Sequence, residues 1–247
     1  MLEDPVAGVS CHMISKAGKV LIVAVSLLAA GAAWTANGDT APAEKLSSAQ
    51  IVEQLQSHNQ ARARALKHYK AVRHYQVEYR GFSKTIVAKM EVEVEYDAAT
   101  GKSFRIVSQS GSKLLCEKVL KRAVESEKEA SQDKGAAALT TANYRFHLAG
   151  SESLGGRPAY ILDVEPVKES KFLYRGKVWV DAVDFAVAKI EVEPAKNPSF
   201  WISRTRIRST NAKTGDFWLP EKNRSETKVR IGGTAVFTID YGTYQIS

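Results

Sequence analysis

The side chains that most often do chemistry are spread along this 247-residue chain rather than gathered in one motif. His58 and His68 fall on one predicted helix, His74 begins a strand and His147 is remote, so their spacings do not assemble a metal site. The sequence contains no Gly-x-Ser-x-Gly elbow, no phosphate-binding loop, no Cys-x-x-Cys pair and no His-Glu-x-x-His motif. We therefore predict a protein that is not an enzyme and requires no metal or other cofactor.

Two strand-like segments carry charges of opposite sign at alternate positions. Alternate glutamates from Glu91 to Glu95 share one strand face, where they either bind a cation or pair with basic side chains. Alternate arginines from Arg204 to Arg208 form a basic face that either meets anionic head groups or a partner protein, or pairs with acidic neighbours. In both cases we favour ordinary cross-strand ion pairs.

The N-terminal segment has the pattern of an export signal. Lys16 and Lys19 precede an apolar run of about 14 residues, Val20–Ala33, which matches the basic and apolar regions of a secretory signal peptide. The run is shorter than the roughly 20 residues that span a membrane, although an uncleaved anchor is the alternative. We predict a signal peptide at 13–43, with Met13 as the true start and 1–12 upstream of it, and a mature domain at 44–247.

Composition allows one sizeable core and argues against a nucleic-acid-binding protein. Hydrophobic residues make up 44% of the chain, and the net charge is +8, which favours anionic surfaces without choosing among them. An exported chain without a nucleic-acid-binding motif makes nucleic acid the weaker choice. Since Cys11 leaves with the signal, Cys116 stands alone, and we predict it as a small core residue.

Periodicity predicts a β-rich domain with two helices. Ser47 and Gln50 form a capping box that starts a helix with an apolar face continuing to Lys70. From Ile86 to Tyr96 apolar residues alternate with charged ones, as in a half-buried strand. A second amphipathic helix is predicted over Lys113–Lys134. Further strands are predicted at 75–80, 104–107, 143–148, 159–164 and in a ladder from Phe172 to Ile246 that includes Trp179, Trp201 and Trp218, with hairpin turns at 155–156 and 232–233.

Three segments in this order resemble the outer-membrane lipoprotein-sorting (LolA/LolB-like) superfamily, which includes sensors of the RseB type. They are Gly176–Asp181, Phe185–Glu191 and Trp218–Pro220, together with the preceding helix and strand pair. The resemblance implies a mainly β (α+β) fold: an unclosed, strongly bent antiparallel β-barrel covered by an N-terminal helix and an inserted helix. It also implies an apolar cavity for acyl chains, with the inserted helix as the candidate lid.

The function implied by this resemblance is a periplasmic carrier or chaperone that binds lipid acyl chains or lipoproteins of the cell envelope without catalysis. Its partners would include an inner-membrane transporter or an outer-membrane acceptor. An RseB-like envelope-stress sensor domain that contacts a membrane regulator is the alternative. A hydrolase with an unrecognised site is a third hypothesis.

Alternation within the strands selects the side chains expected to face the cavity. Some of them serve only as core, so the set is a pool of candidates for the acyl-chain site. Its members are Val77, Tyr79, Met90, Val92, Val94, Phe104, Ile106, Val178, Val180, Ile190 and Val192.

Overall fold

The computed structural model describes residues 46–130, 138–170, 173–196, 200, 202–230 and 232–247. The predicted signal peptide at 13–43 lies outside this part of the chain, as do Phe172 and Trp201 of the predicted strand ladder. Eleven strands occur within the described residues: β1 (His68–Arg80), β2 (Thr85–Asp97), β3 (Gly101–Gly111), β4 (Tyr144–Leu154), β5 (Arg157–Pro166), β6 (Tyr174–Asp181), β7 (Val187–Pro194), β8 (Ile202–Thr214), β9 (Phe217–Val229), β10 (Thr234–Asp240) and β11 (Tyr244–Ile246).

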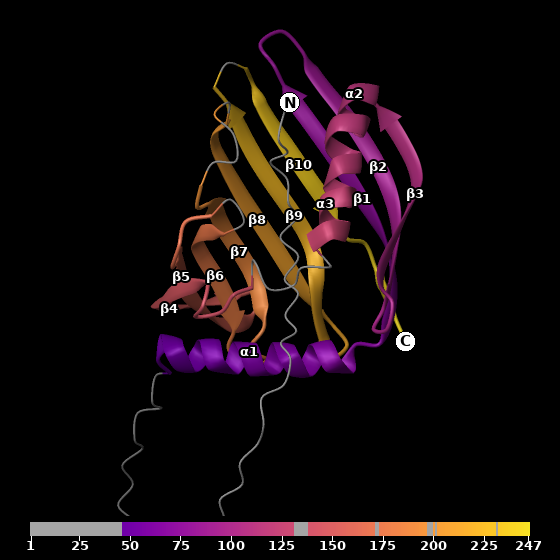
Figure 1. The fold of residues 1–247 in the computed structure, drawn as a ribbon. Coiled ribbons are helices and arrows are strands. Elements are labelled where there is room, and N and C mark those ends of the chain that lie inside the picture. The colour runs from indigo at the N-terminus through magenta and orange to yellow at the C-terminus, as the bar shows by residue number, and fades with distance from the viewer. Residues whose placement is uncertain (1–45, 131–137, 171–172, 197–199, 201, 231) are drawn as a thin grey trace, which may run out of the picture.

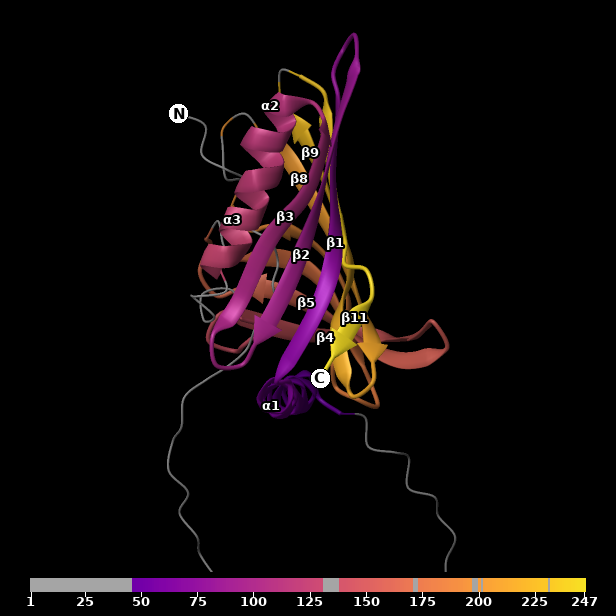
Figure 2. The same cartoon turned by 90° about the vertical axis from the view of Figure 1, so that its right-hand side faces the viewer.

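These strands form one antiparallel sheet in the order β3-β2-β1-β10-β9-β8-β7-β6-β5-β4, and β11 pairs with the first residues of β1. The two ends of this order, β3 and β4, are not paired with each other, so the barrel is unclosed. Figures 1 and 2 show the sheet strongly bent around a concave side. The predicted fold class, a bent antiparallel sheet covered by helices, is therefore confirmed.

Helix α1 (Ser48–Ala65) begins where predicted but ends earlier. The Ser47 hydroxyl accepts a hydrogen bond from the backbone N–H of Gln50, whose side chain accepts one from the backbone N–H of Ser47. The prediction that the helix continues to Lys70 is wrong, because β1 starts at His68. A strand there pairs every following residue with β2, and this long ladder outweighs a short extension of the helical pattern.

The second predicted helix is present as an inserted helical segment made of α2 (Lys113–Leu115), the π-helical turn η1 (Cys116–Leu120) and α3 (Lys121–Ala130). It starts at Lys113 as predicted, and residues 131–134 lie outside the described part of the chain. In Figure 1 this segment lies over β1, β2 and β3, whereas α1 runs across one end of the sheet below β4–β7.

Both predicted glycine turns connect neighbouring strands. Gly155 and Gly156 have φ angles of 59° and 83° and join β4 to β5, as a two-residue hairpin turn requires. Gly233 lies in the β9–β10 turn against β1, where a Cβ atom would stand 1.5 Å from the carbonyl oxygen of Arg80. Only glycine fits so close to the neighbouring backbone.

The hydrophobic core divides into two clusters at the two ends of the sheet. The first cluster joins β1, β2, β10 and the end of the chain to the inserted helical segment. The second cluster joins β4–β8 to α1. Each helical element therefore covers one part of the same bent sheet, and β9, which contributes to neither cluster, lies between them (Figure 1).

Candidate functional site

The predicted acyl-chain residues lie on one face of the sheet but in both clusters. A cross-strand row runs from Val77 to Phe237, then to Ser225, Ile207 and Val192, so residues from both halves of the prediction share this inner face. Val77, Met90, Val92 and Val94 belong to the first cluster, and Phe104 packs against it. The second cluster contains Val178, Val180, Ile190 and Val192.

Two of the predicted residues lie at the margins of this face. Tyr79 is half-buried, and its hydroxyl accepts a hydrogen bond of 3.2 Å from the backbone N–H of Gly233. Ile106 lies on the edge strand β3 and is 37% exposed. These two residues therefore border the apolar face rather than form its centre.

Helices shield both parts of the inner face from water. On the inserted helical segment, Leu120 and Ala123 pack onto the first cluster and are buried. On α1, Ile51, Val52 and Leu55 are at most 1% exposed and pack into the second cluster. An elongated apolar ligand can reach this face only where these covers leave room or move.

A buried ion pair fastens the inserted helical segment to the sheet, and the sequence analysis missed it. Arg73 Nη1 on β1 donates to Glu127 Oε1 on α3 at 2.5 Å, and both residues are at most 4% exposed. Tyr75 Oη donates to Glu127 Oε2 at 3.2 Å, and Lys102 Nζ lies 3.5 Å from Oε1. The sequence pattern could have indicated the inward position of Arg73. This residue falls between the inward-facing Ala71 and Tyr75, and side chains alternate between the two faces of a strand.

The charges in this cluster set its protonation states. Burial acts to raise the pKa of the Glu127 carboxyl, but Arg73 and Lys102 outweigh it and hold that pKa below its usual value. Burial lowers the pKa of Arg73, whereas Glu127 and nearby tyrosines raise it well above normal. Arg73 Nε has no hydrogen-bond partner, and the guanidinium lies 4.7 Å from the ring centroid of Tyr241. Two cations thus share one buried carboxylate.

Asp181, in the segment that suggested the family resemblance, shapes the β6–β7 hairpin. Its carboxylate accepts hydrogen bonds from Arg157 Nε at 2.6 Å and Nη2 at 2.9 Å, and from the backbone N–H of Asp184 at 2.7 Å. Asp184 in turn accepts a hydrogen bond from Trp218 Nε1 at 3.0 Å. The aspartate and the later tryptophan of the motif therefore tie together the β6–β7 and β8–β9 hairpins.

The same hairpin also positions α1. Arg62, near the end of this helix, donates hydrogen bonds to the backbone carbonyls of Asp184 at 2.7 Å and Phe185 at 2.8 Å. These bonds anchor one end of the helix whose other end supplies Ile51 and Val52 to the second cluster. The β6–β7 hairpin, which carries the residues that suggested the family resemblance, therefore holds α1 over the inner face and does not form a reactive centre.

The alternating charges lie on the outer face and pair across strands, as the sequence favoured. Arg204 and Arg206 pair with Glu193, and Arg208 with Glu191. The glutamates of β2 likewise have basic neighbours: Glu91 lies by His74, Glu93 bonds to Arg105 and Glu95 bonds to Lys70. The cross-strand pairing interpretation is confirmed for both sets.

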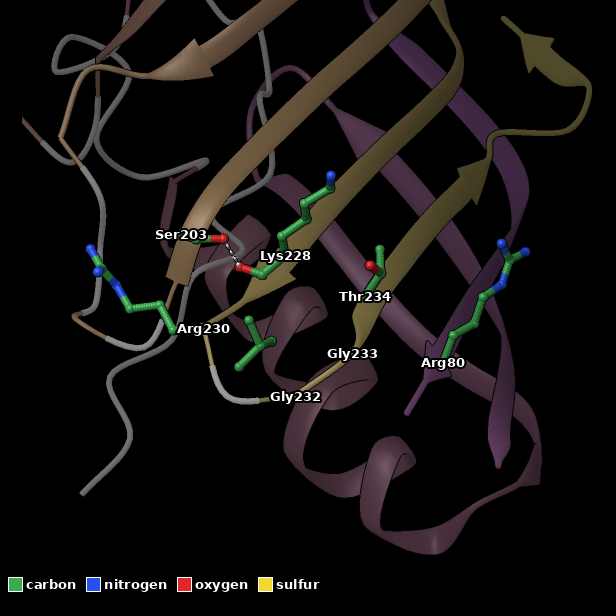
Figure 3. Close-up of a pocket in the computed structure, with 8 residues that line it drawn as sticks. Arg80, Ser203, Lys228, Arg230, Gly232, Gly233 and Thr234 are labelled. Carbon is green, nitrogen blue, oxygen red and sulfur yellow. Dashed lines mark hydrogen bonds between the residues drawn. The ribbon is translucent and has the colours of Figure 1, made fainter. Parts of the chain in front are cut away.

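An open cleft of about 550 Å³ lies elsewhere, beside the β9–β10 turn (Figure 3). Arg80, Thr234 and Lys228 lie in one cross-strand row, and their side chains stand on the same side of the sheet. Arg230 borders the cleft, with its guanidinium 5.0 Å from the ring centroid of Phe200. None of the predicted acyl-chain residues lines this basic cleft.

Other chemical groups do not converge within the described residues. Among them, no cluster of three or more histidine, cysteine, aspartate or glutamate side chains is arranged to hold a metal ion. Cys116 is free and buried, as predicted, with its thiol 3.6 Å from the carbonyl oxygen of Ser110. In the same part of the chain, no helix is both long and apolar enough to cross a membrane.

The strand order and the covered inner face define an unclosed antiparallel β-barrel with helices over an apolar concave side. The fold is similar to three solved structures: a DUF1329 family protein from Desulfovibrio piger (TM-score 0.42, 11% identity, covering 81% of this chain and 93% of that one), a putative outer membrane lipoprotein-sorting protein domain from Vibrio parahaemolyticus (0.42, 12%, 79% and 92%) and a LolA superfamily protein from Nitrosomonas europaea (0.40, 12%, 82% and 94%). No family model and no curated protein matches the sequence. These likenesses concern the fold alone.

Proposed function

We propose that the protein is a periplasmic carrier or chaperone of the cell envelope that holds acyl chains of lipids or lipoproteins on its concave face, without catalysis. The observation that carries this proposal is the inner face itself. Apolar residues from eight strands line it, and two separate helical elements cover it. An enzyme would concentrate polar reactive groups at such a site, whereas a binding protein for apolar chains needs apolar surface.

The energetics of such a site suit a carrier. Each methylene that leaves water for an apolar surface contributes roughly 0.8 kcal/mol, so one long acyl chain supplies on the order of 10 kcal/mol before the costs of association. The ligand must displace or move the helical covers, because the side chains beneath them are already buried. The inserted helical segment is the cover that we expect to move, and its π-helical turn η1 breaks the regular helix near its start.

Location and partners follow from the same proposal. The lysine-flanked apolar run at 16–33 is proposed to direct export, which would leave a mature domain from about residue 44 in the periplasm. A carrier that exchanges buried acyl chains needs a donor and an acceptor at the two membranes. We propose an inner-membrane transporter and an outer-membrane acceptor for these roles. N-terminal sequencing of the stable product checks the first step, since recovery of Met1 or Met13 on a membrane-bound protein would overturn it.

The most direct test is to identify what the native protein holds. Mass spectrometry of an organic extract of the purified protein should find acylated lipid or lipopeptide in near-stoichiometric amount. A second measurement is displacement of a fluorescent fatty acid by unlabelled acyl lipid. Failure to find any bound lipid, together with no fatty-acid affinity in the folded protein, would overturn the proposed function.

Two variants locate the site. Val92→Glu and Ile190→Glu each place an unpaired carboxylate among buried apolar side chains, one in each cluster. We expect each to weaken fatty-acid binding at least tenfold, since an unpartnered polar group in such surroundings costs a few kcal/mol. Glu93→Gln, on the outer face of the same strand, is the matched control and should bind normally. Normal affinity in the folded inward variants would show that chains bind elsewhere.

A further inference from the structure

The buried polar side chains of the described residues fall into two groups. Arg73 and Glu127 bond to each other, and Asp181 is held by Arg157 and by backbone N–H groups. The remaining buried polar side chains share one place, the inner face of β8 and β9 in the middle of the sheet. They are Thr205, Ser209, Asn223 and Ser225.

Strand register fixes how these residues lie. Ser209 is directly opposite Asn223, and Ser225 is opposite Ile207 in the adjacent row. Since directly opposed residues lie roughly 5 Å apart and alternate residues of a strand roughly 7 Å apart, Ser209, Asn223 and Ser225 form a compact triangle. We call this triangle the polar strip.

Apolar strands flank the polar strip on both sides. On β10, Ile239 pairs with Asn223 and belongs to the first cluster, as does the adjacent Phe237. On β7, Ile190 pairs with Ser209 and belongs to the second cluster. A half-buried strand normally places apolar residues at such inward positions, so three polar ones in the centre of an otherwise apolar face need an explanation.

Within the described part of the chain, the polar strip has no internal hydrogen-bond partners. The neighbouring Thr205 and Thr227 hydroxyls bond to each other at 3.1 Å. By contrast, no side-chain hydrogen bond joins Ser209, Asn223 or Ser225 to a described residue, although they are only 9%, 6% and 8% exposed. Each residue is more than nine-tenths buried, yet none of its polar side-chain atoms is among those that are both fully enclosed and unpaired, so these atoms remain open to a partner that binds on this face.

We propose that Ser209, Asn223 and Ser225 hydrogen-bond the uncharged ester or amide linkage of an acylated ligand, with its chains on the apolar surface to either side. This proposal rests on the proposed function and adds the polar group that the carrier recognises. The asparagine amide supplies two N–H donors and one carbonyl acceptor, and each serine hydroxyl supplies one donor. These groups can bind a ligand that carries a carbonyl oxygen next to a hydroxyl or an N–H group. All three side chains are neutral, and a buried charge would need an opposite charge beside it.

The test compares two probes of equal chain length, one with a neutral glycerol ester head and one with no polar group. Displacement of a fluorescent probe from the full mature chain is measured with 1-monostearoylglycerol, a neutral glycerol ester, and with 1-octadecene, a hydrocarbon. The variant Ser209→Ala/Asn223→Leu/Ser225→Ala removes every polar side-chain atom of the strip and keeps the branched shape of the side chain at position 223. We expect it to weaken glycerol-ester binding at least tenfold and to change hydrocarbon binding less than twofold.

Two further variants keep the test decisive. Thr238→Val, on the outer face of the adjacent β10, is the matched control and should change neither affinity. Should the triple variant not fold, the smaller Ser209→Ala/Ser225→Ala variant takes its place, with an expected loss of at least threefold for the ester. The substitutions should not lower stability much, because the polar side chains that they remove make no hydrogen bond to another described residue.

The outcomes separate this inference from the proposed function. Unchanged affinity for both probes, or an equal loss for both in a folded variant, overturns the role of the strip while acyl-chain binding stands. Failure of both probes to bind the unmodified protein overturns the proposed function, and this inference with it. Selective loss of ester binding supports both.

Discussion

Replacing Glu127 by glutamine should destabilise the protein far more than an ordinary change on an amphipathic helix. The carboxylate lies between Arg73 and Lys102 beneath α3, and the Lys102 side chain is itself only 4% exposed. Glutamine has nearly the same shape, so packing is retained while the charge is removed. The variant therefore isolates the electrostatic contribution of the buried ion pair.

The size of the effect follows from the geometry. At the observed 2.5 Å, the attraction between Arg73 and Glu127 amounts to about 7 kcal/mol for an effective dielectric constant of about 20. Desolvation of the two ions costs several kcal/mol each, so the intact pair contributes little net stability. Removing only the anion leaves the desolvation cost of Arg73 without compensation, and the expected loss is about 3–5 kcal/mol.

Urea unfolding followed by circular dichroism measures this loss. Glu125→Gln, at an exposed position of the same helix, is the matched control and should change the free energy of unfolding by less than about 0.5 kcal/mol. The double variant Arg73→Met/Glu127→Leu should be less destabilised than Glu127→Gln, because the Arg73 charge is removed together with the carboxylate and Lys102 is the single cation left of the cluster. A loss below about 1 kcal/mol for Glu127→Gln is the value of a solvent-exposed ion pair and would refute the conclusion that this pair is shielded from water.

The acid limb of stability provides an independent check of the same pair. Burial acts to raise the pKa of Glu127, but Arg73 and Lys102 lower it below its usual value. The stabilising contribution of the carboxylate is therefore complete above its unfolded pKa of about 4.3 and is lost as pH falls through the lower folded value. The unmodified protein should lose stability more steeply below about pH 4 than Glu127→Gln. Parallel pH profiles would contradict this linkage.

Three further predictions concern tyrosine burial, the β9–β10 turn and the β6–β7 hairpin. Burial raises the pKa of Tyr69 from 10.0 to about 12. The contribution of the neutral phenol to the free energy of unfolding should therefore be complete below pH 10 and lost between pH 10 and 12. In urea titrations, Tyr69→Phe should flatten this alkaline decline. Gly233→Ala should destabilise by at least about 1–3 kcal/mol, since the new Cβ meets the carbonyl oxygen of Arg80, and a normal Tm would refute the close approach. Trp218→Phe removes the donor to Asp184 and should cost about 1.5–3 kcal/mol in thermal unfolding, whereas a loss under 0.5 kcal/mol would show that water replaces it.

Local patterns predicted the strands well because one property repeats along each of them. Alternation from Ile86 to Tyr96 predicted β2, which pairs over its whole length with β1 and places its apolar side chains in the first cluster. The end of α1 was predicted too late, because Leu66 and Tyr69 suit a helical stripe as well as a strand. The pairing of Tyr69 with Tyr96 of β2 and with Ile246 of β11 decided between the two, and a local pattern does not show either pairing.

The candidate site was predicted in outline and missed in its polar details. Apolar inward residues such as Val92 and Ile190 follow from alternation alone, and the structure places them on one face. Arg73 and Glu127 were not selected, because a charge at an inward position has meaning only with its partner in view, and that partner is 54 residues away. Asn223 was overlooked for a related reason: its importance lies in the lack of a partner, which a sequence does not display.

The position of β1 in the sheet has a consequence for how the chain reaches this fold. β1 is paired on one side with the adjacent β2, but its other side waits for β10 and β11, so that His74 meets Asp240 across most of the domain. Folding dominated by such distant pairings is slow, typically milliseconds to seconds. Until the last strands arrive, β1 offers an open edge to other chains. Refolding yield should therefore fall as protein concentration rises, and the nascent chain has a specific interval during which it needs protection from aggregation.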